Sequence, residues 1–213
     1  RYSLDKDGLV LANQGDTLQN YLDVIPNPTF TPDENNVVPI LDDYWFQDDI
    51  VNRFYEFTKV AFGEEQINTN INYIENVLNK SIRQYFIKDF YKDHVQTYKK
   101  RPIYWLFSSE KGAFQALIYM HRYTKDTPSI VLRYLRDYIS KLNTKIEELQ
   151  KREIDASISA AEQNKAKKQI EQLQKTLKEL HTYEKDVLYP LATKRIEIDL
   201  DDGVKHNYPL LGK

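Results

Sequence analysis

The clearest pattern of hydrophobic and polar positions lies between residues 129 and 187. Two apolar seams follow alternating steps of three and four residues, the first at Leu132, Leu135, Ile139, Leu142, Ile146 and Leu149. The second is formed by Ile170, Leu173, Leu177, Leu180 and Val187, with Glu184 filling one position. This spacing is typical of helices that bury one narrow stripe against a partner helix.

The segment between the two seams indicates a turn. Residues 155–159 are small and polar, and Ser159 followed by Glu162 forms a capping box, which marks the start of a helix. Two helices joined by a short turn must run antiparallel. The sequence therefore predicts an antiparallel coiled-coil hairpin whose arms have about 25 residues, or about 37 Å at 1.5 Å per residue.

Three shorter helices are predicted upstream, over residues 48–62, 67–78 and 81–98, because their apolar positions also step by three and four. Asp48 and Asp49 suit the positive end of the first helix dipole, and Gly63 can end that helix.

Two short runs rich in aromatic and branched residues, Ile103–Phe107 and Ala116–Met120, predict a β-hairpin with a loop of about five residues. After Pro190, apolar and acidic residues alternate over 196–200, which predicts a half-buried strand. The turn signal at 201–203 indicates a second strand through Val204.

The first 47 residues are rich in turn signals and predict irregular chain with one or two short strands, because they contain Gly8, Gly15, Pro26, Pro28, Pro32 and Pro39. The expected fold class is α+β and mostly helical, with a helical region, a small sheet and the long hairpin. The expected division is a linker or edge region over 1–47, a helical region with the β-hairpin over 48–128, the coiled-coil hairpin over 129–189, and a C-terminal strand and tail over 190–213.

Charge is unevenly distributed behind the net value of −2. Residues 1–80 carry 5 basic and 14 acidic side chains, residues 81–125 carry 9 and 3, and residues 126–213 carry 16 and 15. Attraction to phosphate depends on local charge, so only the middle segment favours nucleic acid.

The middle segment also interleaves its cations with aromatic rings. Cations neutralise phosphates and rings stack on bases, so we expect DNA contact, on one shared surface, from Lys99, Lys100, Arg101, Tyr104, Lys111, Arg122 and Lys125. The alternative is that the rings belong to the core and the lysines to an ordinary solvated face. The charges of the coiled coil, such as Lys165, Lys167, Lys168 and Glu171, are most simply a solvated face.

No catalytic, cofactor or metal site is predicted. Asn27-Pro28-Thr29-Phe30 is one residue away from the Asn-Pro-Pro-Phe loop of amino-methyltransferases, but the second proline and a glycine-rich loop after a strand are missing, so we interpret it as a turn. The acidic groups at 42–43, 48–49 and 199–202 match no Ca²⁺ loop. The four histidines, His94, His121, His181 and His206, lack ligand spacing.

The absence of cysteine excludes disulfides and favours an intracellular location. No apolar run approaches the roughly 20 residues of a membrane span. We therefore expect a cytoplasmic protein without membrane contact. The first residue, Arg1, is not Met, so we also expect the chain to be a fragment of a longer protein.

Several stretches resemble a known family. KRPIYWLFSS at 100–109 and GAFQALIYMHRY at 112–123 are similar to the C-terminal part of PglX-type adenine-specific DNA methyltransferases of BREX phage-defence systems. The resemblance continues, in the same order, at DYWFQDDIV (43–51), FIKDFYKDH (86–94) and DLDDGVK (199–205), and it covers about residues 37–208.

The resemblance implies that the catalytic domain lies N-terminal to Arg1. The whole enzyme would transfer a methyl group from S-adenosylmethionine to adenine N6 of double-stranded DNA. This chain would carry target recognition and spacing, with no cofactor and no catalysis of its own. The resemblance does not identify individual residues that read bases. The alternative function is a protein scaffold that docks other defence-system subunits through the coiled coil, which predicts an exposed apolar stripe along one arm.

Overall fold

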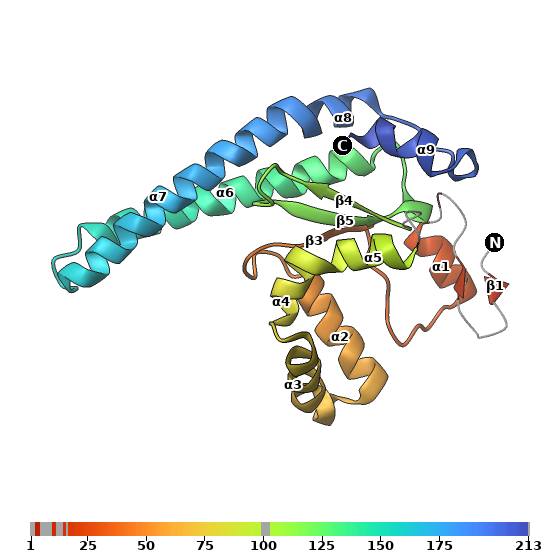
Figure 1. The fold of residues 1–213 in the computed structure, drawn as a ribbon, viewed down its shortest axis with the longest axis horizontal. Helices are drawn as coiled ribbons and strands as arrows, with labels where there is room; N and C mark the ends of the chain where they lie inside the picture. The colour runs from red at the N-terminus through yellow and green to blue at the C-terminus, as the bar shows by residue number, and fades with distance from the viewer. Residues whose placement is uncertain (1–2, 5–9, 12–14, 16, 99–102, 213) are drawn as a thin grey trace.

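The computed structural model describes residues 3–4, 10–11, 15, 17–98 and 103–212. A small antiparallel sheet lies between two groups of helices, and a long helical hairpin projects to one side (Figure 1). The predicted fold class, α+β and mostly helical with a small sheet and a helical hairpin, is confirmed.

The sheet has three strands in the order β3 (Val37–Pro39), β5 (Gln115–Tyr119) and β4 (Tyr104–Ser108). The β4–β5 pair is the predicted hairpin, with Tyr104 opposite Tyr119 and Ser108 opposite Gln115. Its connection, residues 109–114, is one residue longer than predicted, and Gly112 adopts a φ of 75° there. Pro39 lies in an edge strand, where a missing backbone donor is tolerated.

Successive side chains along a strand point to opposite faces of the sheet. They therefore pack into two different cores. Ala116 and Ile118 pack in the core shared with the long hairpin, whereas Leu117 packs against the upstream helices. On β4, Phe107 belongs to the first core and Leu106 to the second. Burial on both sides accounts for the continuous apolar runs of these strands.

The three predicted upstream helices are confirmed. They are α2 (Ile50–Phe62), α3 (Ile67–Leu78), and a third that contains α4 (Ile82–Tyr85), a π-helical turn (Phe86–Phe90) and α5 (Tyr91–Thr97). Asp49 caps α2 by accepting from the Val51 amide at 2.9 Å, and Gly63 ends that helix.

The start of α2 is tied to α4 by a buried ion pair. The guanidinium of Arg83 donates to both carboxylate oxygens of Asp49, at 2.9 and 3.0 Å, and to the Leu41 carbonyl at 2.8 Å. Asp49 is fully buried. The pair therefore joins two helices to the chain that leaves β3.

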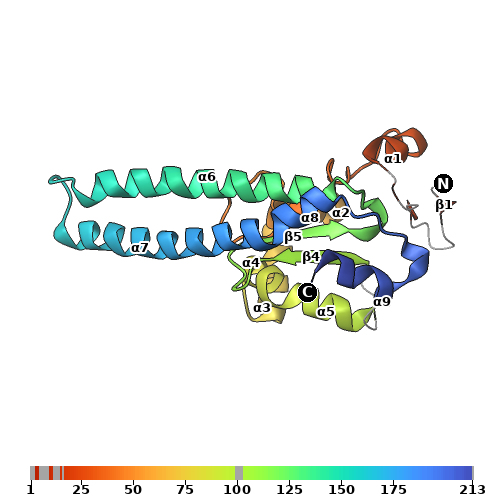
Figure 2. The same cartoon turned by 90° about the horizontal axis from the view of Figure 1, so that it is seen from above.

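The long hairpin consists of α6 (Thr127–Glu153) and α7 (Ala160–Tyr183), which run side by side (Figure 2). All six predicted seam residues of the first arm are buried, and the capping box between Ser159 and Glu162 is present. Every large apolar side chain of α6 and α7 is buried or half-buried. The arms thus lack the exposed apolar stripe that docking through the coiled coil would require.

One predicted seam position is wrong. A π-helical turn (Glu184–Leu188) separates α7 from α8 (Tyr189–Lys194). Because a π-turn adds a residue to the helical turn, the buried position moves from Val187 to Leu188. Val187 is 36% exposed, whereas Leu188 is 0% exposed.

The predicted C-terminal strands are also wrong. Residues 196–199 bury alternate side chains, with Ile198 buried, but they join no ladder. The Tyr123 hydroxyl donates to the Ile196 carbonyl at 2.9 Å, and the Asn207 side-chain amide donates to the Asp199 carbonyl. Side chains therefore satisfy carbonyls that a neighbouring strand would otherwise engage.

Short helical segments end the chain, namely a 3-10 turn (Leu200–Asp202), α9 (Val204–Asn207) and a 3-10 turn (Tyr208–Leu211). They replace the second strand that the turn signal at 201–203 predicted.

The first 47 residues contain a ladder between β1 (Ser3–Leu4) and β2 (Val10–Leu11), the strand β3, and one helix that was not predicted, α1 (Leu18–Val24). Thr17 and Asn20 cap α1 reciprocally, a signal visible in the sequence. None of the helices in the described ranges is long and apolar enough to cross a bilayer.

Candidate nucleic-acid interface

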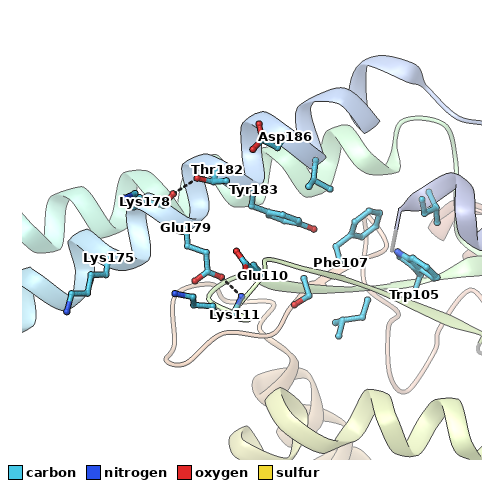
Figure 3. A pocket seen from close by; sticks show the side chains of 14 residues that line it. Trp105, Phe107, Glu110, Lys111, Lys175, Lys178, Glu179, Thr182, Tyr183 and Asp186 are labelled. Carbon is cyan, nitrogen blue, oxygen red and sulfur yellow. Dashed lines mark hydrogen bonds between the residues drawn. The ribbon is translucent and has the colours of Figure 1, made fainter.

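A cleft of about 640 Å³ lies between α7 and the turn of the β4–β5 hairpin (Figure 3). Its floor is aromatic, with Trp105 and Phe107 from β4 and Tyr183 from the end of α7. Its rim is charged, with cations from both elements. The cleft thus joins residues that are about 70 positions apart in the sequence.

Glu179 of α7 holds the hairpin turn in place. One of its carboxylate oxygens accepts from the Ser109 hydroxyl at 2.5 Å, from the Lys111 amide at 2.8 Å and from the Ala113 amide at 3.3 Å. Ser109 is buried, and its hydroxyl also accepts from the Phe114 amide at 3.0 Å. The turn is therefore fixed against α7 by a charged acceptor, which forms stronger hydrogen bonds than a neutral one.

Three exposed lysines, Lys111, Lys175 and Lys178, stand around the cleft. Within the described part of the chain, none of them forms an ion pair. Glu179 is occupied by the hairpin turn. The three ammonium groups are consequently available to an anion from outside, although Glu110 and Asp186 also lie at the rim.

The aromatic floor is held by its neighbours. Trp105 packs on Tyr208 with ring centroids 4.7 Å apart, and Tyr183 lies 6.5 Å from Phe114. Burial raises the pKa of the Tyr183 hydroxyl, and a hydrogen bond to the Ser108 backbone opposes this shift. Phe107 and Tyr183 are buried in the main core, so the rings shape the floor of the cleft, and the cations at its rim are the groups that can meet a phosphate.

The structure places the predicted candidates in several different environments. Lys99, Lys100 and Arg101 lie outside the described residues. Tyr104 is half-buried in the core beneath the sheet, where its ring centroid lies 5.1 Å from that of His94, and burial raises its pKa.

Arg122 and Lys125 have partners within the chain. Arg122 donates to the backbone carbonyls of Asp33 at 2.6 Å and Glu34 at 2.9 Å, and Lys125 pairs with Glu197 at 3.4 Å. Arg122 also lines a second cavity of about 540 Å³, together with Tyr104. The fold therefore engages Arg122 through the backbone, whereas Lys125 remains 48% exposed in a surface pair.

The expected single surface is therefore not formed by Lys111 and Arg122. Lys111 belongs to the closed end of the β4–β5 hairpin and Arg122 follows its open end. Lys111 lies instead beside Lys175 and Lys178, which were interpreted from the sequence as part of a solvated face. Only the docking of α7 on the hairpin turn brings them together, and no sequence pattern places that contact.

Several of the carboxylates considered for a metal have other partners. Asp48 accepts from the Tyr134 hydroxyl, Asp42 from the Trp45 indole at 3.0 Å, and Asp199 from the Asp201 amide at 2.9 Å. Among the described residues there is no group of three or more His, Asp or Glu side chains that could hold a metal ion.

Comparison with known proteins found no matching family model. Over its whole length the chain is 37% identical to the adenine-specific methyltransferase BrxX of Escherichia coli O9:H4 (strain HS). Over 98% of its length it is 38% identical to the adenine-specific methyltransferase PglX of Lacticaseibacillus casei (strain Zhang). The chain spans 19% and 18% of these two proteins.

Proposed function

The chain is a relative of one region of the PglX-type adenine-specific methyltransferases, and from that premise we propose that it is a non-catalytic region that contacts DNA. In this proposal it is the C-terminal region of a longer phage-defence enzyme, and it contributes target recognition and spacing. Methyl transfer from S-adenosylmethionine to adenine N6 takes place in another part of that protein.

The turn at residues 27–30 is not arranged to hold an extruded base. The nearest match to a methylation loop, Asn27–Phe30, has its ring packed edge-on against Phe57, with centroids 5.6 Å apart. The guanidinium of Arg53 covers that ring at 4.5 Å. Because Phe30 is engaged on two sides, it is not free to stack on an extruded base, and we derive no catalytic step from it.

The cleft beside α7 is the observation that carries the proposal. Three lysines that form no ion pair with any described residue surround an aromatic floor, and the contacts of Glu179 hold the turn that bears Lys111. Lysines neutralise phosphates without reading sequence. The net charge of −2 means that this contact adds to the affinity of the longer protein instead of providing all of it.

Duplex-DNA binding by the full-length protein across a salt series tests the proposal. The triple variant Lys111→Gln, Lys175→Gln, Lys178→Gln should bind more weakly, with a log–log salt slope shallower by up to about 2.7, because each phosphate contact contributes about 0.9. A control variant removes the same charge elsewhere, through Lys59→Gln, Lys145→Gln and Lys151→Gln. Equal slopes for the two variants would contradict DNA contact at the cleft.

A protein scaffold is the second candidate function. One observation favours a docking surface on the upstream helices instead of on the coiled coil. The helices α2 and α3 expose Phe62, Tyr73 and Val77, each by more than 60%. Large exposed apolar side chains on neighbouring helices are a feature of protein-binding surfaces. The variant Tyr73→Asp, Val77→Asp should then reduce co-purification of the other defence-system subunits and leave DNA binding unchanged.

A further inference from the structure

Beyond the cleft, the outer face of α7 carries a row of long polar side chains. Lys165, Lys168, Gln172 and Lys175 follow steps of three, four and three, so they lie on one side of the helix. Ala166 and Ile170, each two residues from Lys168, are buried against α6. Two residues correspond to about 200° of rotation, so the row faces away from α6 and into solvent.

A shallow hollow of about 360 Å³ accompanies the row. It is lined, apart from one alanine, by lysines and side-chain amides, namely Ala161, Asn164, Lys165, Lys168, Gln169 and Gln172. No carboxylate of the described part of the chain lines it. The nearby Glu162 is engaged in the capping box with Ser159, and Glu171 flanks the row as an exposed side chain.

Lys165 has a charged neighbour near this hollow, the capping-box carboxylate of Glu162, whose pKa is lowered by hydrogen bonds from Ser159 and also by Lys165. Within the described residues, Lys165 and Lys168 form no ion pair. On α6, by contrast, Arg136 pairs with Glu184 at 2.7 Å and Lys145 with Glu148 at 3.3 Å. The positive face of α7 is therefore directed outward, and at one end it meets the cleft lysines.

We propose that the outer face of α7 binds the phosphodiester backbone of one DNA strand, continuing the cleft contact along the projecting hairpin. This inference rests on the proposed function and extends it. Lys165 and Lys178 are 13 residues apart, or about 20 Å along the helix at 1.5 Å per residue. The phosphates of one B-DNA strand rise by about 3.4 Å each along the duplex axis while they wind around it, so a straight row of this length, continued to Lys178 of the cleft, faces several phosphates of one strand.

The side chains of the row also fit a backbone ligand. Ammonium and amide groups donate to phosphate oxygens, and such contacts fix register and orientation but carry no sequence information. The row would therefore bind every DNA sequence equally well, and the long hairpin would orient the duplex relative to the sheet.

The test uses the full-length protein with duplex DNA. In the variant Lys165→Gln, Lys168→Gln, glutamine keeps a good helix former at both positions, so the hairpin should remain folded, as judged by circular dichroism. The salt slope should become shallower by about 1.8, because two contacts of about 0.9 are lost. The hydroxyl-radical footprint should shorten at one flank only.

The matched control is Lys145→Gln, Lys151→Gln on the other arm of the same hairpin, which removes the same charge. Its slope and footprint should equal those of the unmodified protein. If the cleft variant weakens binding while Lys165→Gln, Lys168→Gln binds with an unchanged slope and footprint, the proposed backbone contact of α7 is wrong but the proposed function stands. If neither variant changes the slope, both proposals are wrong.

Discussion

The carboxylate of Glu179 accepts a hydrogen bond from the hydroxyl of Ser109 at 2.5 Å, across 70 residues of sequence. This contact joins the long hairpin to the turn of the β-hairpin and positions Lys111 beside the lysines of α7 (Figure 3). The shape of the cleft therefore depends on one charged side chain.

Replacing Glu179 with alanine should destabilise the chain by about 1.5–3 kcal/mol, because a charged acceptor is lost and the buried Ser109 hydroxyl loses its acceptor. Glu179→Gln keeps one oxygen and should cost less. Chemical denaturation measures both, and hydrogen exchange should be faster at the amides of Lys111 and Ala113. An unchanged unfolding free energy for Glu179→Ala would contradict the role of this contact.

The Asp49–Arg83 pair should be the most sensitive polar contact upstream of the sheet. Asp49→Ala removes the cap of α2 and leaves a half-buried guanidinium without its anion, so we expect a loss of about 3–5 kcal/mol. Asp49→Asn retains an oxygen for the Val51 amide and should cost less. Thermal unfolding of the two variants gives the comparison, and an unchanged unfolding free energy for Asp49→Asn would show that the ion pair contributes little.

Helix periodicity correctly predicted those parts of the fold in which an apolar seam packs against another regular helix. Leu132 to Leu149 on α6 are buried as the three–four spacing required. The prediction was wrong at Val187, because a π-turn changes the register without a sequence signal, and at residues 196–200, because alternate burial does not require a ladder. A local sequence pattern indicates which side chains are buried, whereas strand pairing depends on segments that are distant in the sequence.

The shift of the buried position from Val187 to Leu188 can be tested directly by mutating these two neighbouring residues. Leu188→Ala should cost about 2–5 kcal/mol, because it leaves a cavity in the main core. Val187→Ala removes a partly exposed side chain and should cost less than about 1 kcal/mol. Denaturant titration of the two variants distinguishes the observed register from the one predicted by the seam, which gives the opposite order.

Stability should fall in mild acid because of His94. Its Nε2 accepts from the amides of Ile103 at 3.1 Å and Tyr104 at 3.3 Å, which requires a neutral ring, and burial lowers its pKa from 6.5. The unfolded chain therefore binds the proton more tightly than the folded chain does. The contribution of His94 is complete above about pH 6.5 and is lost as the pH falls below it.

The measurement is the unfolding free energy at pH 7.5 and pH 5.0. His94→Gln, which cannot titrate, should show a smaller loss between these pH values than the unmodified chain. If both lose the same free energy, other groups cause the acid sensitivity.

The candidate site was less predictable than the fold. Composition identified Lys111 as a cation of the basic segment, but the same argument selected Arg122, whose guanidinium holds the backbone at Asp33 and Glu34. Charge alone does not distinguish a cation that binds its own chain from one that faces solvent. Lys175 and Lys178 were missed because their significance depends on the contact between α7 and the hairpin turn.

The central claim is that DNA lies against α7 at the cleft, and site-directed cross-linking tests it most directly. This chain contains no cysteine, so it adds no competing thiol when a photo-cross-linker is attached through Lys175→Cys or, as the control, Lys145→Cys in the full-length protein. We predict that position 175 forms adducts with duplex DNA and that position 145 forms few. Equal yields at the two positions, or adducts from position 145 alone, would contradict the account.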